Sequence, residues 1–433
     1  MSDDIKVAPV QNKQRHQSLD ALRGFALLGI LSINILGFGL PGMAFMFPSV
    51  AGGTEGANFT AWAITEMYSL GSMRTLFSMM FGAGVVLLTS RMFERGQGEL
   101  AADIYYRRTI WLLALGLVDG YLFLWWGDIL FGYALVGLFL YPLRNVSAKK
   151  LMITATIILS LISLPRLGIL IQGPELIAQA REAQVIEADG GELTEEQTNA
   201  LNQYNSFAEM IAPPQEDIDA QVEAMQGGYG SAISHVSKDT YKYQWKNAFP
   251  GIFIDVLMMM LFGMAFIKKG ILTLECKTKT YALFLIFGYG FGFAMRSFDV
   301  MKAAELGLGV DGILFSFVFM EPSRFALAMG HIGLIMLMLR SGVFGWLMAA
   351  FAAVGRMALS NYLMQSIICA FIFYGIGFGL YGTLERHELY PIMAGIWAFQ
   401  IIFSVVWMKM FRFGPFEWVW RSLTYNKRQP MRH

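Results

Sequence analysis

Charged residues and cysteine are scarce in this sequence of 433 residues. Only 15% of the residues are charged, whereas soluble domains carry about 25%, and this excludes an ordinary soluble enzyme. The formal net charge of +1 excludes nucleic acid as a partner bound through a basic surface. The two cysteines, Cys276 and Cys369, have a spacing that fits neither a metal site nor a disulfide framework.

The common catalytic motifs are missing as well. The sequence has no Walker motif, no His-Glu-x-x-His and no Gly-x-Ser-x-Gly. The glycines of Gly288-x-Gly290-x-Gly292 lie inside an apolar run, so they are not a dinucleotide loop. We therefore expect no metal site, and any chemistry has to be sought in isolated polar residues.

Hydrophobic residues are abundant, at 55% of the chain, with a mean hydropathy of +0.49. Because a helix needs about 20 mostly apolar residues to cross a bilayer, the pattern predicts an all-α, polytopic membrane helix bundle of about ten spans. Two weaker segments are Ile313–Met320, either an extension of the eighth span or a separate short helix, and Phe344–Val354, a half-helix at the interface. The predicted spans are Gly24–Leu40, Tyr68–Thr89, Thr109–Trp126, Ile129–Leu143, Leu151–Leu170, Phe249–Ile267, Tyr281–Met295, Phe325–Leu339, Met357–Leu380 and Ile392–Met410.

Lysine and arginine are concentrated in alternate connections between these spans. The loop Leu40–Met67 contains neither, whereas the next connection contains Arg91, Arg95, Arg107 and Arg108. Since short cytoplasmic loops carry the excess of Lys and Arg, the pattern predicts that both termini are cytoplasmic.

One long hydrophilic stretch, Ile171–Lys246, falls on the outer side and is acidic. Its polar pattern predicts short amphipathic helices, and it is either a functional lid or a solvated insertion. The chain thus divides into an N-terminal five-helix membrane region (1–172), an extracytoplasmic acidic loop (173–246) and a C-terminal five-helix membrane region (247–433).

Ionisable residues inside a span are functional candidates, because inserting one costs about 2.5–3.5 kcal/mol. Asp119 lies midway along the third predicted span and His331 lies in the eighth. An Asp that contacts a His sets its tautomer for general-base catalysis, although backbone carbonyls can also satisfy a buried His. Asp128 is either the N-cap of the fourth span or a carboxylate that binds the acceptor. These three are the candidate catalytic residues.

Polar residues also gather near both ends of the predicted bundle. Asp20 and Arg23 share a helix face at the cytoplasmic end, either as a pair that recognises a phosphorylated cofactor or locks a gate, or as a simple ion pair and cap. A polar cluster opens the ninth span: Arg356, Ser360, Asn361, Tyr362 and Gln365. For the residues near outer span ends, snorkelling to the interface is the default interpretation: Asn34, Arg74, Asp255, Arg296 and Arg324.

Taken together, five segments resemble YeiB-type bacterial inner-membrane proteins, a domain-of-unknown-function family. The resemblance covers nearly the whole chain and is strongest near the C-terminus. The segments are Ser18–Leu31 with Asn34, Leu76–Gly84, Gly127–Leu130 with Tyr133, Gly355–Leu363 with Gln365, and Arg412–Trp418 with Trp420 and Arg421.

The YeiB type is similar to a superfamily of membrane acyltransferases that includes the lysosomal heparan-α-glucosaminide N-acetyltransferase and bacterial sugar O-acyltransferases. This resemblance implies a many-helix, often dimeric protein of the bacterial inner membrane, in contact with membrane lipids. It also implies that an acyl group passes from cytoplasmic acyl-CoA to a hydroxyl or amine on a small-molecule, glycan or lipid acceptor. The YeiB type generally has His where this chain has Asp119, and an aromatic residue where it has His331.

On this hypothesis, His331 is the general base or a transient acyl carrier, and Asp119 orients it if the two side chains meet. The donor site for acyl-CoA would contain Asp20, Arg23, Arg107, Arg108, Arg356 and Asn361, and the acceptor site Asn34, Arg74 and Gln365. The alternative hypothesis is a transporter or exporter of a small molecule or lipid precursor, since buried Asp and His also suit proton coupling. Binding of acyl-CoA would distinguish the two hypotheses.

Overall fold

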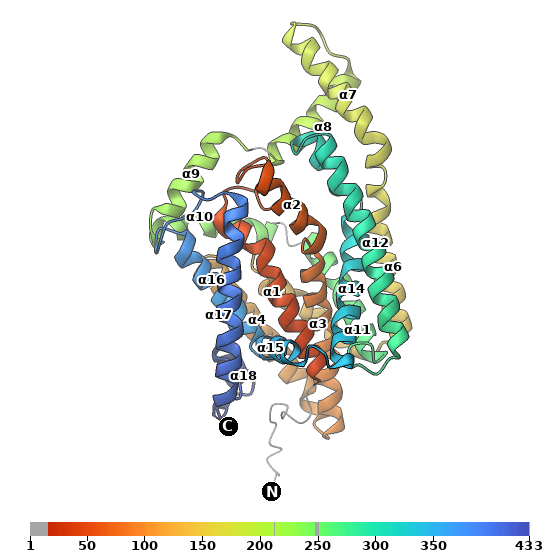
Figure 1. Ribbon diagram of the computed structural model, residues 1–433, viewed down its shortest axis with the longest axis vertical. Coiled ribbons are helices and arrows are strands. Elements are labelled where there is room, and N and C mark those ends of the chain that lie inside the picture. Colours follow the sequence, from red (N-terminus) through yellow and green to blue (C-terminus); the bar gives the residue numbers. More distant parts are fainter. Residues whose placement is uncertain (1–15, 212, 247–250, 433) are drawn as a thin grey trace.

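A computed structural model describes residues 16–211, 213–246 and 251–432, and every regular element in these ranges is a helix (Figure 1). Extended backbone pairs there only in an isolated antiparallel bridge between Phe411 and Arg432. The predicted all-α class is therefore confirmed.

Within the described ranges, six helical segments are long and apolar enough to cross a membrane, or seven if a bent helix pair counts as one span. The chain is thus a multi-pass membrane protein, although the expected ten spans are not confirmed by this count. The six segments are α1 (Gln17–Gly39), α2 with α3 (Gly56–Tyr68 and Ser72–Glu94), α6 with α7 (Ala148–Arg166 and Ile169–Ala188), α12 (Thr278–Glu305), α14 (Met320–Ser341) and η6 with α17 (Arg386–Glu388 and Leu389–Met410).

Each predicted span overlaps an observed helix, but three of these helices belong neither to the six segments nor to the bent pair. They are α4 (Ala101–Tyr121), α5 (Ile129–Leu140) and α11 (Phe253–Lys268). The start of the predicted span at residues 249 and 250 lies outside the described residues. Short 3₁₀ turns flank this part of the bundle, namely η2 (Gly98–Leu100) and η3 (Tyr141–Asn145).

The two weaker segments form separate helices. Residues of Ile313–Met320 contribute to the short helix α13 (Val310–Phe315) before α14 begins. The predicted half-helix is α15 (Gly345–Arg356), which is bent by 79° against α16 (Ala358–Phe373). Together α15 and α16 are the bent pair that makes the possible seventh span.

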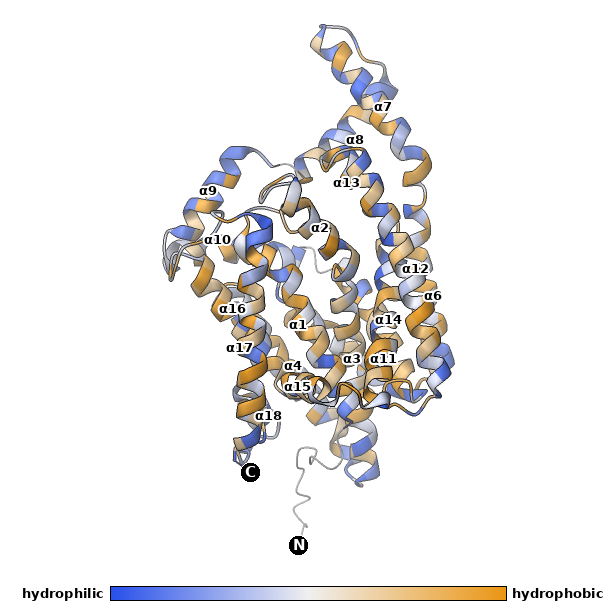
Figure 2. Ribbon diagram, in the orientation of Figure 1, coloured by the Kyte–Doolittle hydropathy of each residue, from blue (hydrophilic) through white to orange (hydrophobic). Residues whose placement is uncertain are grey.

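The hydrophilic stretch forms the amphipathic helices that its pattern predicts. After α7 come α8 (Glu195–Ile211), α9 (Gln215–Gln226), α10 (Tyr229–Tyr241) and a π-helix, η4 (Lys242–Lys246). Figure 2 shows α8, α9 and the far part of α7 as largely hydrophilic, beyond the apolar bundle. The segment α10–η4 then returns to the bundle, where Thr240 and Gln244 are buried against α4.

Helix α1 lies in the middle of the bundle and crosses α15 at backbone contact. A Cβ atom at Gly24 would stand 1.9 Å from the carbonyl oxygen of Phe351, and one at Gly355 would stand 1.9 Å from that of Asp20. Only glycine permits this approach. The crossing places the start of α1 beside the bend between α15 and α16, at the end of the molecule where α18 (Pro415–Thr424) lies (Figure 1). We call this the α18 end.

Candidate functional site

A cavity of about 270 Å³ extends into the bundle from the α18 end, between α1, α3, α4, α5, α16 and α18. Its inner wall is mostly apolar and includes Met80, Phe81, Leu112 and Leu130. Its charged lining is dominated by arginine, with two carboxylates: Arg23, Arg91, Arg108, Arg356 and Arg421, with Asp20 and Glu417. The cavity therefore combines a cationic entrance with an apolar interior.

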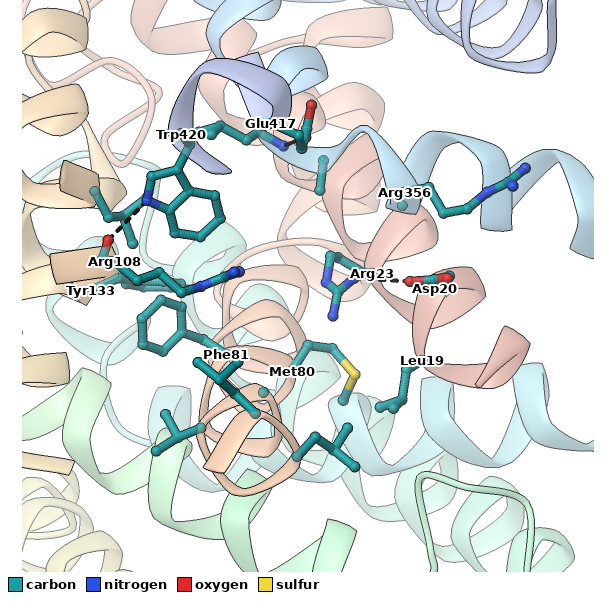
Figure 3. Close-up of a pocket in the computed structure, with 18 of the residues that line it drawn as sticks. Leu19, Asp20, Arg23, Met80, Phe81, Arg108, Tyr133, Arg356, Glu417 and Trp420 are labelled. Carbon is teal, nitrogen blue, oxygen red and sulfur yellow. Dashed lines mark hydrogen bonds and ion pairs between the residues drawn. The ribbon is translucent and has the colours of Figure 1, made fainter. Parts of the chain in front are cut away.

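Arg23 and Arg108 face each other across this cavity (Figure 3). Arg23 donates to the carboxylate of Asp20 at 3.0 Å. Arg108 stacks on the indole of Trp420, 3.8 Å from the ring centroid, and the Trp420 Nε1 donates to the Arg108 carbonyl oxygen at 2.8 Å. The two guanidinium groups thus point at one space from opposite helices, whereas Arg356 points away from it.

Glu417 of α18 caps the start of α16. Its carboxylate accepts the backbone N–H of Leu359 at 2.7 Å and that of Ser360 at 3.1 Å, together with the Ser360 hydroxyl. An anion at a helix N-terminus satisfies N–H groups that lack intrahelical partners. Burial raises the pKa of Glu417, and the hydrogen bonds from Ser360 oppose that rise. This contact joins the two C-terminal segments of the YeiB-type resemblance.

His16 lines the cavity just before α1. Burial, together with the charge of Arg91, lowers the pKa of His16, while Glu275 and Asp20 act in the opposite direction. The imidazole is therefore neutral at pH 7, and the positive charge of the entrance comes from arginine.

The other predicted donor-site residues take different positions. Arg107 pairs with Asp103 and does not line the cavity. Asn361 is buried, and its amide donates to the Ser404 hydroxyl at 2.9 Å. Gln365, predicted to bind the acceptor, donates to Gln400 at 3.0 Å. These two amides therefore tie α16 to α17 within the described structure.

The structure gives Asp119 and His331 different neighbours. His331 Nδ1 lies 2.8 Å from the hydroxyl of Tyr289, and its ring packs on Phe25, outside the cavity lining. Asp119 faces Asp128 and Ser366 instead. The arrangement thus pairs the two aspartates rather than Asp119 with His331.

Asp128 is the N-cap that one sequence interpretation expected. Its carboxylate accepts the N–H of Leu130 at 3.0 Å and that of Phe131 at 2.8 Å, at the start of α5. It is 1% exposed. Capping therefore explains the aspartate at the start of α5. It does not explain why the carboxyl of Asp128 also contacts that of Asp119.

Near the α7 end of the bundle, Arg74 belongs to a chain of ion pairs, which we call the Asp255 network (Arg74, Arg166, Asp255, Glu321 and Arg324). Arg74 lies 2.8 Å from Asp255, which also pairs with Arg324. Arg324 bonds Glu321 at 2.7 Å, and Arg166 lies 3.1 Å from Glu321.

The snorkelling interpretation is wrong for Arg296 and Arg324, which are 0% and 2% exposed. Each pairs with carboxylates inside the protein: Arg324 in the Asp255 network, and Arg296 at 3.6 Å from both Glu66 and Asp299. A buried carboxylate offers these guanidinium groups a partner without their having to reach the interface. Asn34, also predicted to bind the acceptor, is half-buried on α1.

Several residues of the site were not singled out as functional from the sequence. Glu417, Trp420 and Arg421 appeared only within a resembling segment, Arg91 only as a basic residue of a connection, and His16 not at all. Their sequence signal is a basic or aromatic residue at a helix end, which is common. In the part of the chain that the structure describes, no three His, Cys, Asp or Glu side chains gather as a metal site.

Comparison with known proteins gives matches along nearly the whole chain. A family described as DUF418, a protein of unknown function, matches residues 266–427. The uncharacterized protein YeiB of Escherichia coli K12 is 30% identical, over 96% of this chain and 98% of that protein. The uncharacterized protein YxaH of Bacillus subtilis is also 30% identical, over 98% and 97%. No solved structure gives a significant match.

Proposed function

This chain belongs to the DUF418 family of YeiB-type proteins, and from that premise we propose that its cavity binds an amphiphilic anion. The ligand that we propose is acyl-CoA, whose acyl group is transferred to a hydroxyl or amine acceptor at or across the membrane. The observation that carries this proposal is the pair of guanidinium groups, Arg23 and Arg108, at the entrance of an apolar cavity.

The chemistry of the two ends of the cavity matches the two ends of such a ligand. Guanidinium groups bind phosphates through planar, charge-assisted hydrogen bonds, and Arg108 rests on an aromatic ring beside Arg23 at the entrance. Apolar side chains such as Met80 and Phe81 suit an acyl chain. The cavity holds about 270 Å³, below the usual range for a drug-sized ligand, so we place the CoA nucleotide outside it, against the arginines.

The same proposal fixes an orientation in the membrane. The arginine-lined entrance is at the α18 end, and basic residues mark cytoplasmic loops. We infer that α4, α5 and α11 complete the ten crossings, that both termini face the cytoplasm and that the membrane is the bacterial inner membrane. Acyl-CoA, a cytoplasmic donor, then reaches the entrance directly.

A thermal-shift series on detergent-purified protein tests the proposal. We expect CoA, acetyl-CoA and palmitoyl-CoA to raise the unfolding midpoint as each exceeds its dissociation constant, with the largest shift for the longest acyl chain. Arg23→Gln and Arg108→Gln should weaken binding about tenfold, which is 1.4 kcal/mol. Arg107→Gln is the matched control, because its neighbour Arg108 lines the cavity and Arg107 does not. Equal shifts for all three variants would contradict the proposal.

The second candidate function, export of a lipid-linked precursor, draws on the same amphiphilic cavity. A lipid phosphate also has an anionic head and an apolar tail. The two functions differ in whether an acyl group is consumed. If a lipid phosphate stabilises the protein through Arg108 while no acyl-CoA does so, transport is favoured over acyl transfer.

A further inference from the structure

Two buried aspartates lie between the inner end of the cavity and the outer insertion. Asp119 is 0% exposed and Asp128 is 1% exposed, and their carboxyl groups interact with each other. Asp128 caps α5, but within the described chain neither carboxyl oxygen of Asp119 has a donor in hydrogen-bond geometry. A hydrogen held between the two carboxyls satisfies the Asp119 oxygens that have no donor.

The groups that face the two carboxyls are hydroxyls. Tyr362 and Ser366 come from α16, Tyr374 follows it, and Tyr243 belongs to η4. Arg74 lies beyond these hydroxyls. It contacts Tyr243 and forms an ion pair with Asp255 at 2.8 Å. Two negative charges in contact inside a membrane protein strongly disfavour double ionisation.

Tyr362 connects the aspartates to the cavity, whose wall it forms. Its oxygen accepts the N–H of Ile129 at 3.0 Å, which leaves its own hydrogen to donate to the carboxylate of Asp128. Gly116 makes room for this arrangement, since a Cβ there would stand 2.7 Å from the Asp128 Oδ2.

The outer side of the pair is closed by the returning insertion. Thr240 donates to the Gly120 carbonyl at 3.2 Å, and the Gln244 amide donates to that of Gly116 at 3.5 Å. Thr240 and Gln244 are 0% and 2% exposed, and the Gln244 Oε1 is a further buried acceptor without a donor in the described structure. Of the four hydroxyls that face the pair, Tyr362 lines the cavity and the other three do not, so the route to the cavity runs through Tyr362.

We propose that Asp119 and Asp128 share one proton and exchange it with the cavity through the hydroxyl of Tyr362. For the acyl transfer, which rests on the proposed function, the ionised member of the pair accepts the proton of the acceptor's hydroxyl or amine. As the new C–O or C–N bond forms and the thioester C–S bond breaks, the proton passes back to the departing CoA thiolate. The proton-holding unit is thus Asp119, Asp128 and Tyr362, and it does not involve His331.

Infrared spectroscopy of the purified protein at pH 7 tests the shared proton without any ligand. We expect the C=O band of a protonated carboxyl group that is present in the wild type and absent in both Asp119→Asn and Asp128→Asn. Asparagine is also a good N-cap, so Asp128→Asn keeps the start of α5. Asp103→Asn, an exposed position on the same helix, is the matched control and keeps the band.

Transfer into D₂O tests the route. The band should shift on deuteration in the wild type, and the shift should become at least tenfold slower in Tyr362→Phe. If the C=O band remains in both Asp119→Asn and Asp128→Asn, the proposal of a shared proton is overturned. An unchanged exchange rate in Tyr362→Phe overturns the route.

A third measurement separates this inference from the proposed function. If acyl-CoA binds and is consumed, Asp119→Asn should keep the dissociation constant of CoA, lower kcat at least a hundredfold and remove one limb of the pH–rate profile. Unchanged kcat overturns the role in transfer. If CoA does not bind but the infrared band behaves as expected, the shared proton stands and the acyl transfer falls.

Discussion

Two arginine-rich regions of this protein differ in what holds their guanidinium groups. In the Asp255 network, Arg74, Arg166 and Arg324 each have a carboxylate partner. At the cavity, Arg108 rests on the ring of Trp420, and the carboxylate of Glu417 is occupied by backbone N–H groups of α16. The first arrangement pairs each guanidinium group with a carboxylate inside the bundle, whereas the second leaves the charge of Arg108 available at an opening. The arginines of the Asp255 network are therefore suited to holding helices together, and Arg108 is suited to binding a ligand.

Removing the central carboxylate of the network should have the largest effect on stability. Asp255→Asn leaves the buried Arg324 and the half-buried Arg74 without that charge, and breaking a buried pair in this way costs about 3–5 kcal/mol. We expect the thermal midpoint in detergent to fall sharply, while the exposed Asp103→Asn changes stability by less than about 1 kcal/mol. Equal midpoints for these two variants would show that the network is not structural.

Removing the cap of α16 should have the next largest effect. Glu417→Ala leaves the N–H groups of Leu359 and Ser360 without their acceptor, at a cost of about 1–3 kcal/mol. Thermal unfolding measures the loss, and Glu417→Gln should recover part of it because its amide oxygen can still accept. A Glu417→Ala protein as stable as the wild type would mean that another group caps α16.

The stacking of Arg108 should affect the ligand more than the fold. Trp420→Leu removes the ring beneath Arg108, and a cation–π contact contributes about 0.5–2 kcal/mol. Isothermal titration with CoA should therefore give a dissociation constant up to about thirtyfold higher. Trp418→Leu is the matched control, because Trp418 lies on the same helix but bonds the Gln429 carbonyl oxygen and does not line the cavity. Identical affinities in the two variants would contradict a role for the stack.

The smallest expected effect is a pH dependence at His16. Since the folded protein lowers the pKa of His16, the ligand-free fold loses stability as pH falls below the ordinary value of about 6.5. An anion in the cavity favours the imidazolium, so CoA should bind more tightly as pH falls toward the lowered pKa of the free protein, by at most about tenfold per pH unit, and the affinity should level off below it. His16→Gln should flatten this rise relative to the wild type. A parallel pH profile in both proteins would exclude His16.

Local patterns predicted the helices better than the contacts between them. The apolar run Gly24–Leu40 predicted α1, because a segment inside a membrane has to form a helix to satisfy its backbone hydrogen bonds. The half-helix before α16 and the amphipathic helices of the outer insertion were also predicted from the sequence pattern, whereas the bend of 79° was not. Arg107 and Arg108 were both predicted for the donor site, but only Arg108 lines the cavity. A shift of one residue turns a side chain by about 100° around the helix axis.

The sequence by itself determined that this protein is an all-helical, multi-pass membrane protein of the YeiB type, because hydropathy and motifs are properties of single segments. Only the tertiary structure decided that Glu417 caps α16, that Arg108 stacks on the ring of Trp420 and that Asp119 faces Asp128. Trp420 and Arg108 are separated by 312 residues in the chain, and Glu417 and Ser360 by 57. Such contacts arise where helices cross, and crossings like that of Gly24 with Gly355 depend on the packing of both helices at once.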